Sequence, residues 1–75
     1  MYIVLEIQKT GDQIATLVTS YQNRNEAESK FYTVLAAAAL STVEKHAASL
    51  LTDNGICIRS EAYEHPVETI EESVQ

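Results

Sequence analysis

Apolar and polar side chains alternate along residues 2–9, which is the pattern of a β-strand. One side of this strand carries Ile3, Leu5 and Ile7, and the other carries Tyr2, Val4, Glu6 and Gln8. The chain turns over residues 9–12, and residues 13–21 are rich in β-branched and aromatic types. The pattern predicts a β-hairpin over residues 2–21.

We expect a helix to cover the side of this hairpin that carries Ile3, Leu5 and Ile7. Tyr2, Val4, Ile14 and Val18 are then too many apolar groups for an outward face in water. The outward face is therefore expected to be covered as well, either by the C-terminal tail or by another subunit.

The next segment has the signals of a helix start. Asn23 with Glu26, and Asn25 with Glu28, both have the spacing of a capping box in which Asn replaces Ser or Thr. Apolar residues then recur at three- and four-residue steps, which predicts a helix whose core stripe is formed by Ala27, Phe31, Val34, Leu35 and Ala38.

A second side of this predicted helix carries mostly small side chains and is formed by Ala36, Ala37 and Leu40. Two explanations stay open: Ala is the best helix former, and small side chains also let another helix come close. The second explanation predicts self-association, with an interface formed by Ala36, Ala37 and Leu40 and by Tyr2 and Val4 of the outward face.

Residues 41–52 fit both a helical and an alternating pattern. The sequence Asp53-Asn54-Gly55 is a strong hairpin turn, and residues 56–63 after it have the composition of a strand. Because a hairpin needs an incoming strand, we assign residues 44–52 to that strand and end the helix near Ser41. The alternative is one continuous helix from Asn25 to about Leu51.

The predicted fold class is therefore α+β, in the order β-β-α-β-β. We expect a four-stranded antiparallel sheet with one helix packed on one face, within a single domain over residues 1–64. Residues 65–75 form an acidic tail in which Val67, Ile70 and Val74 recur at helical spacing after Pro66. The tail is either frayed or docked on a sheet.

The charges are distributed unevenly. The chain has a formal net charge of −6, and residues 61–75 contribute five glutamates and no Lys or Arg. The rest is nearly neutral and lacks the basic stripe that long nucleic acids require. A small phosphorylated ligand, held by two or three local cations, stays possible.

The sequence carries no motif of a known chemistry. It has no nucleophile elbow and no phosphate-binding glycine loop, and its one Cys and two His lack the spacing of a zinc site. We expect no enzyme activity, no metal and no cofactor. Cys57 lies between two isoleucines and is predicted to be a buried strand residue. His46 is expected to be a solvated or hydrogen-bonded structural histidine, although it is also the best single candidate for a role.

Seven polar or aromatic residues are candidates for a ligand site, if the fold brings them together. They are Arg24, Lys30, Tyr32, Lys45, His46, Arg59 and Tyr63. The start of the chain has no signal-peptide pattern and no apolar run has membrane-spanning length, so we expect a soluble protein in the cytoplasm of the cell that makes it.

Several separate segments resemble a family of small uncharacterised proteins of Gram-positive phages and prophages. These segments are residues 2–8, the block from Ala27 to Leu35 with its alanine run, His46, and the closing Glu61-Ala62-Tyr63-Glu64-His65. The likeness covers nearly all of residues 1–65. Relatives often have a proline just before the equivalent of His46, whereas this chain has Glu44-Lys45 there.

The resemblance implies a phage protein without an assigned reaction. On this basis we expect an oligomeric, non-enzymatic accessory protein that counters host defence. It would sequester a small nucleotide-like signal or block a host defence protein. The alternative is a structural or assembly component of the virion, which docks onto a larger particle.

Overall fold

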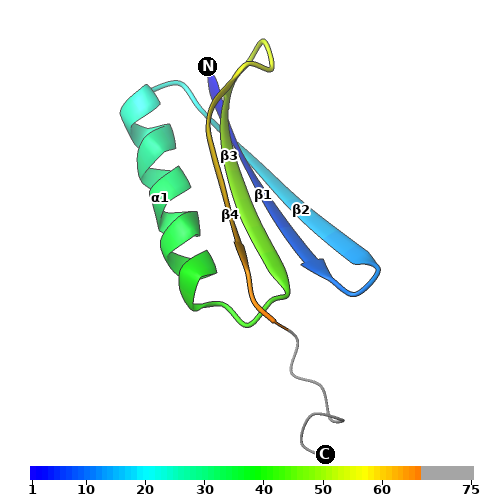
Figure 1. Cartoon of the computed structure of the whole chain (residues 1–75). Coiled ribbons are helices and arrows are strands. Elements are labelled where there is room, and N and C mark those ends of the chain that lie inside the picture. Colours follow the sequence, from blue (N-terminus) through cyan, green and yellow to red (C-terminus); the bar gives the residue numbers. More distant parts are fainter. Residues whose placement is uncertain (67–75) are drawn as a thin grey trace, which may run out of the picture.

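The computed structural model describes residues 1–66 of the chain and has the order β-β-α-β-β. The elements are β1 (Tyr2–Thr10), β2 (Gln13–Tyr21), α1 (Arg24–Leu40), β3 (Lys45–Thr52) and β4 (Cys57–Glu64). The strands form one antiparallel sheet in the order β2-β1-β3-β4, and α1 lies along one side of it (Figure 1). The predicted fold class is confirmed.

Both predicted hairpins and the predicted end of the helix are present. Gly11 and Gly55 have positive φ values of 60° and 87°, which suits the tight turns of the two hairpins. Asn23 is the N-cap and its side chain accepts a hydrogen bond from the Asn25 amide at 2.7 Å. The helix ends at Leu40 with Ser41 as C-cap, so the continuous-helix alternative for residues 25–51 is excluded.

The core lies between α1 and the sheet. Of the predicted core stripe of the helix, Ala27, Phe31, Val34 and Ala38 are buried, and Leu35 is half-buried against them. The sheet contributes Val4, Ala48 and Leu50. Deep burial of this small set is what holds the helix on the sheet, because each large apolar side chain contributes about 1.5–3 kcal/mol when it is fully buried.

The prediction of which side of β1 faces the helix is wrong. Val4 is 1% exposed and belongs to the core, and Tyr2 packs against that core, so neither forms the outward face. Both sides of β1 are apolar, and alternation separates the two sides without telling which one the helix covers. The side of β1 that carries Tyr2 and Val4 therefore faces the helix, and the side that carries Ile3, Leu5 and Ile7 faces away from it.

A second apolar face is present on the side of the sheet away from α1. By the strand register it is formed by Ile3, Leu5 and Ile7 of β1, Ile14 and Val18 of β2, and Ala47 and Leu51 of β3. We call this set the open face, because no helix or strand within residues 1–66 covers it. Ile14 and Val18 are 63% and 59% exposed.

The burial predicted for Cys57 is also wrong, because its side chain is exposed as a free thiol. It begins the edge strand β4, where the β3–β4 register shifts between Leu50 and Leu51. This shift turns Ile58 toward the core, where it packs, while Cys57 stays outside. A β-bulge of this kind breaks the simple alternation on which the prediction rested.

The predicted domain lies within the described residues, and most of the predicted tail lies outside them. All five elements lie within residues 2–64, and the predicted tail residues Val67, Ile70 and Val74 lie outside the described residues. Over residues 1–66, α1 is too short and too polar to cross a membrane.

Candidate functional site

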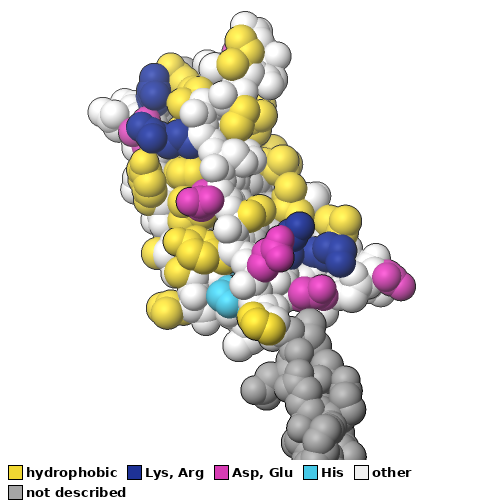
Figure 2. Space-filling model, in the orientation of Figure 1, with side chains coloured by type: hydrophobic (Ala, Val, Ile, Leu, Met, Phe, Trp, Pro, Cys, Tyr) yellow, Lys and Arg dark blue, Asp and Glu magenta, His cyan; other side chains and the backbone are white. Residues whose placement is uncertain are grey.

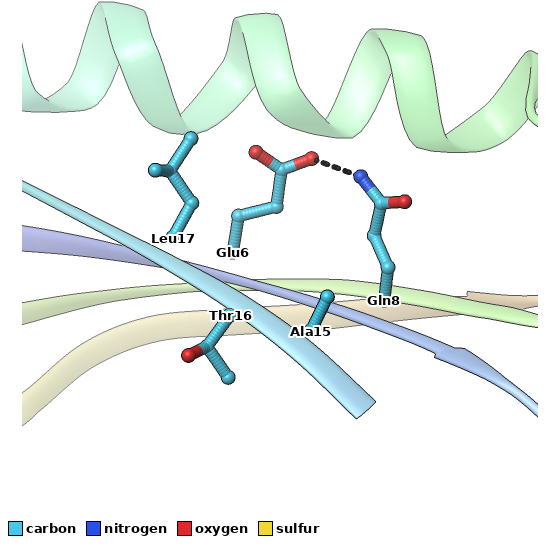
Figure 3. Close-up of a pocket in the computed structure, with 5 residues that line it drawn as sticks. All are labelled: Glu6, Gln8, Ala15, Thr16 and Leu17. Atoms are coloured by element: carbon cyan, nitrogen blue, oxygen red, sulfur yellow. Dashed lines mark hydrogen bonds between the residues drawn. The ribbon is translucent and has the colours of Figure 1, made fainter. Parts of the chain in front are cut away.

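A polar cluster lies in the layer between α1 and the sheet. Glu6 of β1 and His46 of β3 point to the helix side, and Oε2 of Glu6 lies 2.6 Å from Nε2 of His46. The Gln8 side-chain amide donates to the same carboxylate oxygen at 3.0 Å (Figure 3). Pairing of β1 with β3 brings these residues together across 40 positions of sequence.

The carboxyl of Glu6 is held in its ionised form. Burial raises the pKa of Glu6, but the hydrogen bonds from His46 and Gln8 and the charges of His46 and Lys30 outweigh burial, so the net pKa is lower than usual. An ionised carboxylate only accepts hydrogen bonds, so Nε2 of His46 carries the proton and donates it. The cluster is therefore a charge-assisted pair.

His46 is nearly closed to solvent. The residue is 5% exposed, and its Nδ1 is buried without a hydrogen-bond partner among the described residues. A carboxylate that orients a histidine is one part of a proton-transfer site, but such a site also needs a ring nitrogen that faces a substrate. The buried position of Nδ1 suits His46 to a structural role.

A hollow of about 130 Å³ adjoins the cluster on the side of β2. It is lined by Glu6, Gln8, Ala15, Thr16 and Leu17. Glu6, Gln8 and Leu17 point toward α1, whereas Thr16 points to the opposite face of the sheet (Figure 3). The helix packs mainly over β3 and β1, so this part of its side of the sheet stays uncovered, and Leu17 is 54% exposed.

Two of the predicted ligand-binding cations share one carboxylate. Nε of Arg24 lies 3.1 Å and Nε of Arg59 lies 3.9 Å from Oε2 of Glu28. Figure 2 shows one group of dark-blue side chains at the end of the molecule where α1 begins and a second group toward the β1–β2 turn. This pair is the closest approach to a local basic site among the candidates.

The other candidates are spread over the molecule. Lys30 acts on Glu6 through its charge, and Tyr63 lies beside His46 across the β3–β4 pairing. Lys45 belongs to the opposite side of the sheet and pairs with Glu64 at 3.4 Å. Tyr32 is 49% exposed on α1. The fold therefore does not gather the seven residues into one pocket.

The predicted helix interface is accessible. Ala36, Ala37 and Leu40 are exposed, and Leu40 reaches 88% exposure. On the open face, the hydroxyls of Ser49 and Ser60 hydrogen bond to each other at 3.0 Å across the β3–β4 pair. These polar groups satisfy one another within an otherwise apolar surface.

Sequence analysis did not single out Glu6, Gln8 or Leu17 for a site, nor Leu5 for a contact surface. One signal for Glu6 was present, because it is a charged residue at a position that alternates with Tyr2 and Val4 in an apolar strand. Its partner could not be known before β1 was placed beside β3. The signal for Leu5 was that both sides of β1 are apolar.

Comparisons with known proteins identify no relative. No family model matches the chain, and neither a curated protein nor a solved structure is significantly similar to it. The resemblance to small phage proteins stays a prediction.

Proposed function

We propose that this protein is a non-enzymatic binding module that works as a homo-oligomer, with the open face as the contact between copies. The observation that carries this proposal is the apolar character of a sheet surface that lacks a cover within residues 1–66. An antiparallel sheet that faces water on one side has polar outward residues there. Here Ile3, Leu5, Ile7 and Leu51 occupy such positions instead.

A second copy is the occupant that fits this surface. Four strands spaced about 4.8 Å apart and about eight residues long give one side of the sheet an area of roughly 500 Å² before side-chain relief is counted, and the open face occupies three of these strands. The accessible area of such a surface is larger than this flat area, and each partner of a standard interface buries about 800 Å² of accessible area. Two such faces pack as a sheet sandwich about 10 Å thick.

The polar groups of the open face do not oppose such packing. Ser49 and Ser60 satisfy each other. Lys9 and Lys45 lie side by side at one end of the face, where Lys45 pairs with Glu64. Buried polar groups are tolerated when they are hydrogen-bonded. The central part of the face can therefore be desolvated without leaving a charge unpaired.

The resemblance to phage proteins supports a role against host defence for this module. The dispersed cations favour the blocking of a host defence protein over the capture of a nucleotide-like signal. A phosphate group needs several cations at one place. Within residues 1–66 most of the basic side chains lie in separate pairs that already have a carboxylate: Arg24 and Arg59 lie beside Glu28, and Lys45, opposite Lys9, pairs with Glu64. A broad surface is the better match to a protein partner.

Substitution Leu5→Lys tests the proposal. Leu5 lies on the open face between Val18 and Ser49, so the new charge stays hydrated in a single copy and becomes buried without a partner between two copies. Such a buried charge costs about 3–5 kcal/mol, which weakens association at least about 100-fold. Sedimentation velocity of wild type and variant over a range of concentrations measures the change.

The matched control is Ala37→Glu, which adds a charge to the exposed side of α1. We expect this variant to sediment as wild type does. Dissociation by Ala37→Glu with no effect of Leu5→Lys would move the contact to the helix and overturn the proposal. A wild-type monomer would favour the virion component, which meets its partner only on a larger particle.

A further inference from the structure

The two edges of the sheet differ in how they are protected. The strand order β2-β1-β3-β4 places β2 and β4 at the edges, where each strand presents unpaired peptide groups on its outer side. Proteins protect such edges with charged residues, prolines or bulges, because an unprotected edge pairs with another strand.

Edge strand β4 has this protection and β2 lacks it. Strand β4 carries Arg59, Glu61 and Glu64, and its pairing with β3 contains a register shift. Strand β2 has the sequence QIATLVTSY, without a charged residue, a proline or a glycine, and most of its residues are exposed. A regular nine-residue edge is thus left without a partner strand among residues 1–66.

We propose that β2 pairs in antiparallel fashion with β2 of a second copy, centred on Leu17, so that two sheets become one continuous sheet. This contact is separate from the open face. A copy of β2 is a suitable partner because the strand carries no charge to repel itself. Centring on Leu17 pairs the full length of both strands and leaves only the charged β4 edges outside.

The side chains of β2 complement one another in this arrangement. Thr16 lies opposite Val18 of the second copy, and such β-branched pairs stabilise antiparallel strands. Leu17, more than half exposed in one copy, lies beside Leu17 of the second copy. No two like charges meet along the pair.

Pairing also completes the hollow next to Glu6. In one copy this hollow is open toward β2, because α1 packs mainly over β3 and β1 (Figure 1). Two copies joined at β2 place two such hollows side by side between two helices. The floor of this groove carries Glu6, Gln8 and Leu17 from both copies, so the recess is incomplete without the second copy.

Disulfide cross-linking tests the pairing. Cys57 is first replaced in Cys57→Ser, and Leu17→Cys is then added. Residues directly opposite in antiparallel strands have Cα atoms about 4.5–5.5 Å apart, which lies within the range of a disulfide. The matched control is Gln13→Cys in the same background, because the two Gln13 positions would lie about 26 Å apart.

We expect Leu17→Cys to form a covalent dimer at least about 10-fold faster than Gln13→Cys under the same mild oxidant, measured on non-reducing gels. Equal rates, or no dimer from Leu17→Cys, would overturn the proposal. The comparison is repeated with Leu5→Lys also present. Continued cross-linking shows that the β2 contact is independent of the open face, and its loss would overturn that independence.

This design separates the two proposals. Cross-linking by Leu17→Cys, together with an unchanged assembly in Leu5→Lys, would refute the open-face contact and retain the β2 contact. Dissociation by Leu5→Lys without cross-linking by Leu17→Cys would refute the β2 contact and retain the open-face contact.

Discussion

Glu6 and His46 place an ionisable pair in a layer that is otherwise apolar. The two side chains are 16% and 6% exposed, and they lie on the same side of the sheet as Val4, Ala48 and Leu50. A pair of this kind is costly to bury and costly to break, because removal of one partner leaves the other unsatisfied. The pair joins a side chain of β1 to a side chain of β3 under the helix.

The pair makes stability depend on pH. The pKa of Glu6 is lower in the folded chain than in the unfolded chain, so the unfolded state binds more protons in acid. The contribution of Glu6 is therefore complete above the ordinary carboxyl pKa and is lost as the pH falls through the lower folded value.

We predict that Glu6→Gln lowers the free energy of unfolding at pH 7 by about 1–1.5 kcal/mol, because a charge-assisted hydrogen bond becomes a neutral one. The difference from wild type should disappear in acid below the folded pKa of Glu6. Urea unfolding at a fixed protein concentration, repeated over a pH series, measures it. Asp12→Asn in the exposed first turn is the control. A constant difference at every pH would contradict this role of Glu6.

At the scale of elements, the helix is defined by local signals. Asn23 accepts from the Asn25 amide, Ala27 donates to the Asn23 carbonyl at 3.1 Å, and the Ser41 amide closes the other end on Ala38. Glu26 lies in the first turn, where a negative charge suits the helix dipole. These signals are in the sequence, so the helix could be placed before the sheet was known.

We predict that Asn23→Ala destabilises the fold by about 1 kcal/mol, because the side-chain acceptor of the N-cap is lost. Asn25→Ala is the matched control, since Asn25 contributes its backbone amide to the cap and the substitution keeps that amide. Urea unfolding followed by circular dichroism compares the two. An equal loss in both variants would argue against Asn23 as the cap.

The elements and their order could be predicted because they depend on short-range patterns. The β3–β4 hairpin was placed by its turn sequence, even though residues 41–52 alone also fitted a helix. The faces of β1 could not be assigned, because Val4 and Leu5 are both apolar and their sides are decided by packing. The contact of Glu6 with His46, the exposure of Cys57 and the scatter of the basic residues depend on strand order and on the bulge in β4.

At the scale of the whole molecule, one helix covers one side of a sheet that is apolar on both sides. The open face and the β2 edge are two different surfaces. We propose that each one contacts the same surface of another copy of the chain. Two such self-complementary contacts close into four copies with dihedral symmetry when their two-fold axes intersect at right angles, and this is the arrangement that we predict. The charged β4 edges remain on the outside of that assembly.

Native mass spectrometry of the unmodified chain tests the central claim most directly. We predict a closed oligomer at four times the mass of the 8.3 kDa chain at tens of micromolar, which falls to two copies in Leu5→Lys. A species that stays at 8.3 kDa under these conditions, or an oligomer that Leu5→Lys leaves unchanged, would contradict the assignment of the open face as the contact between copies.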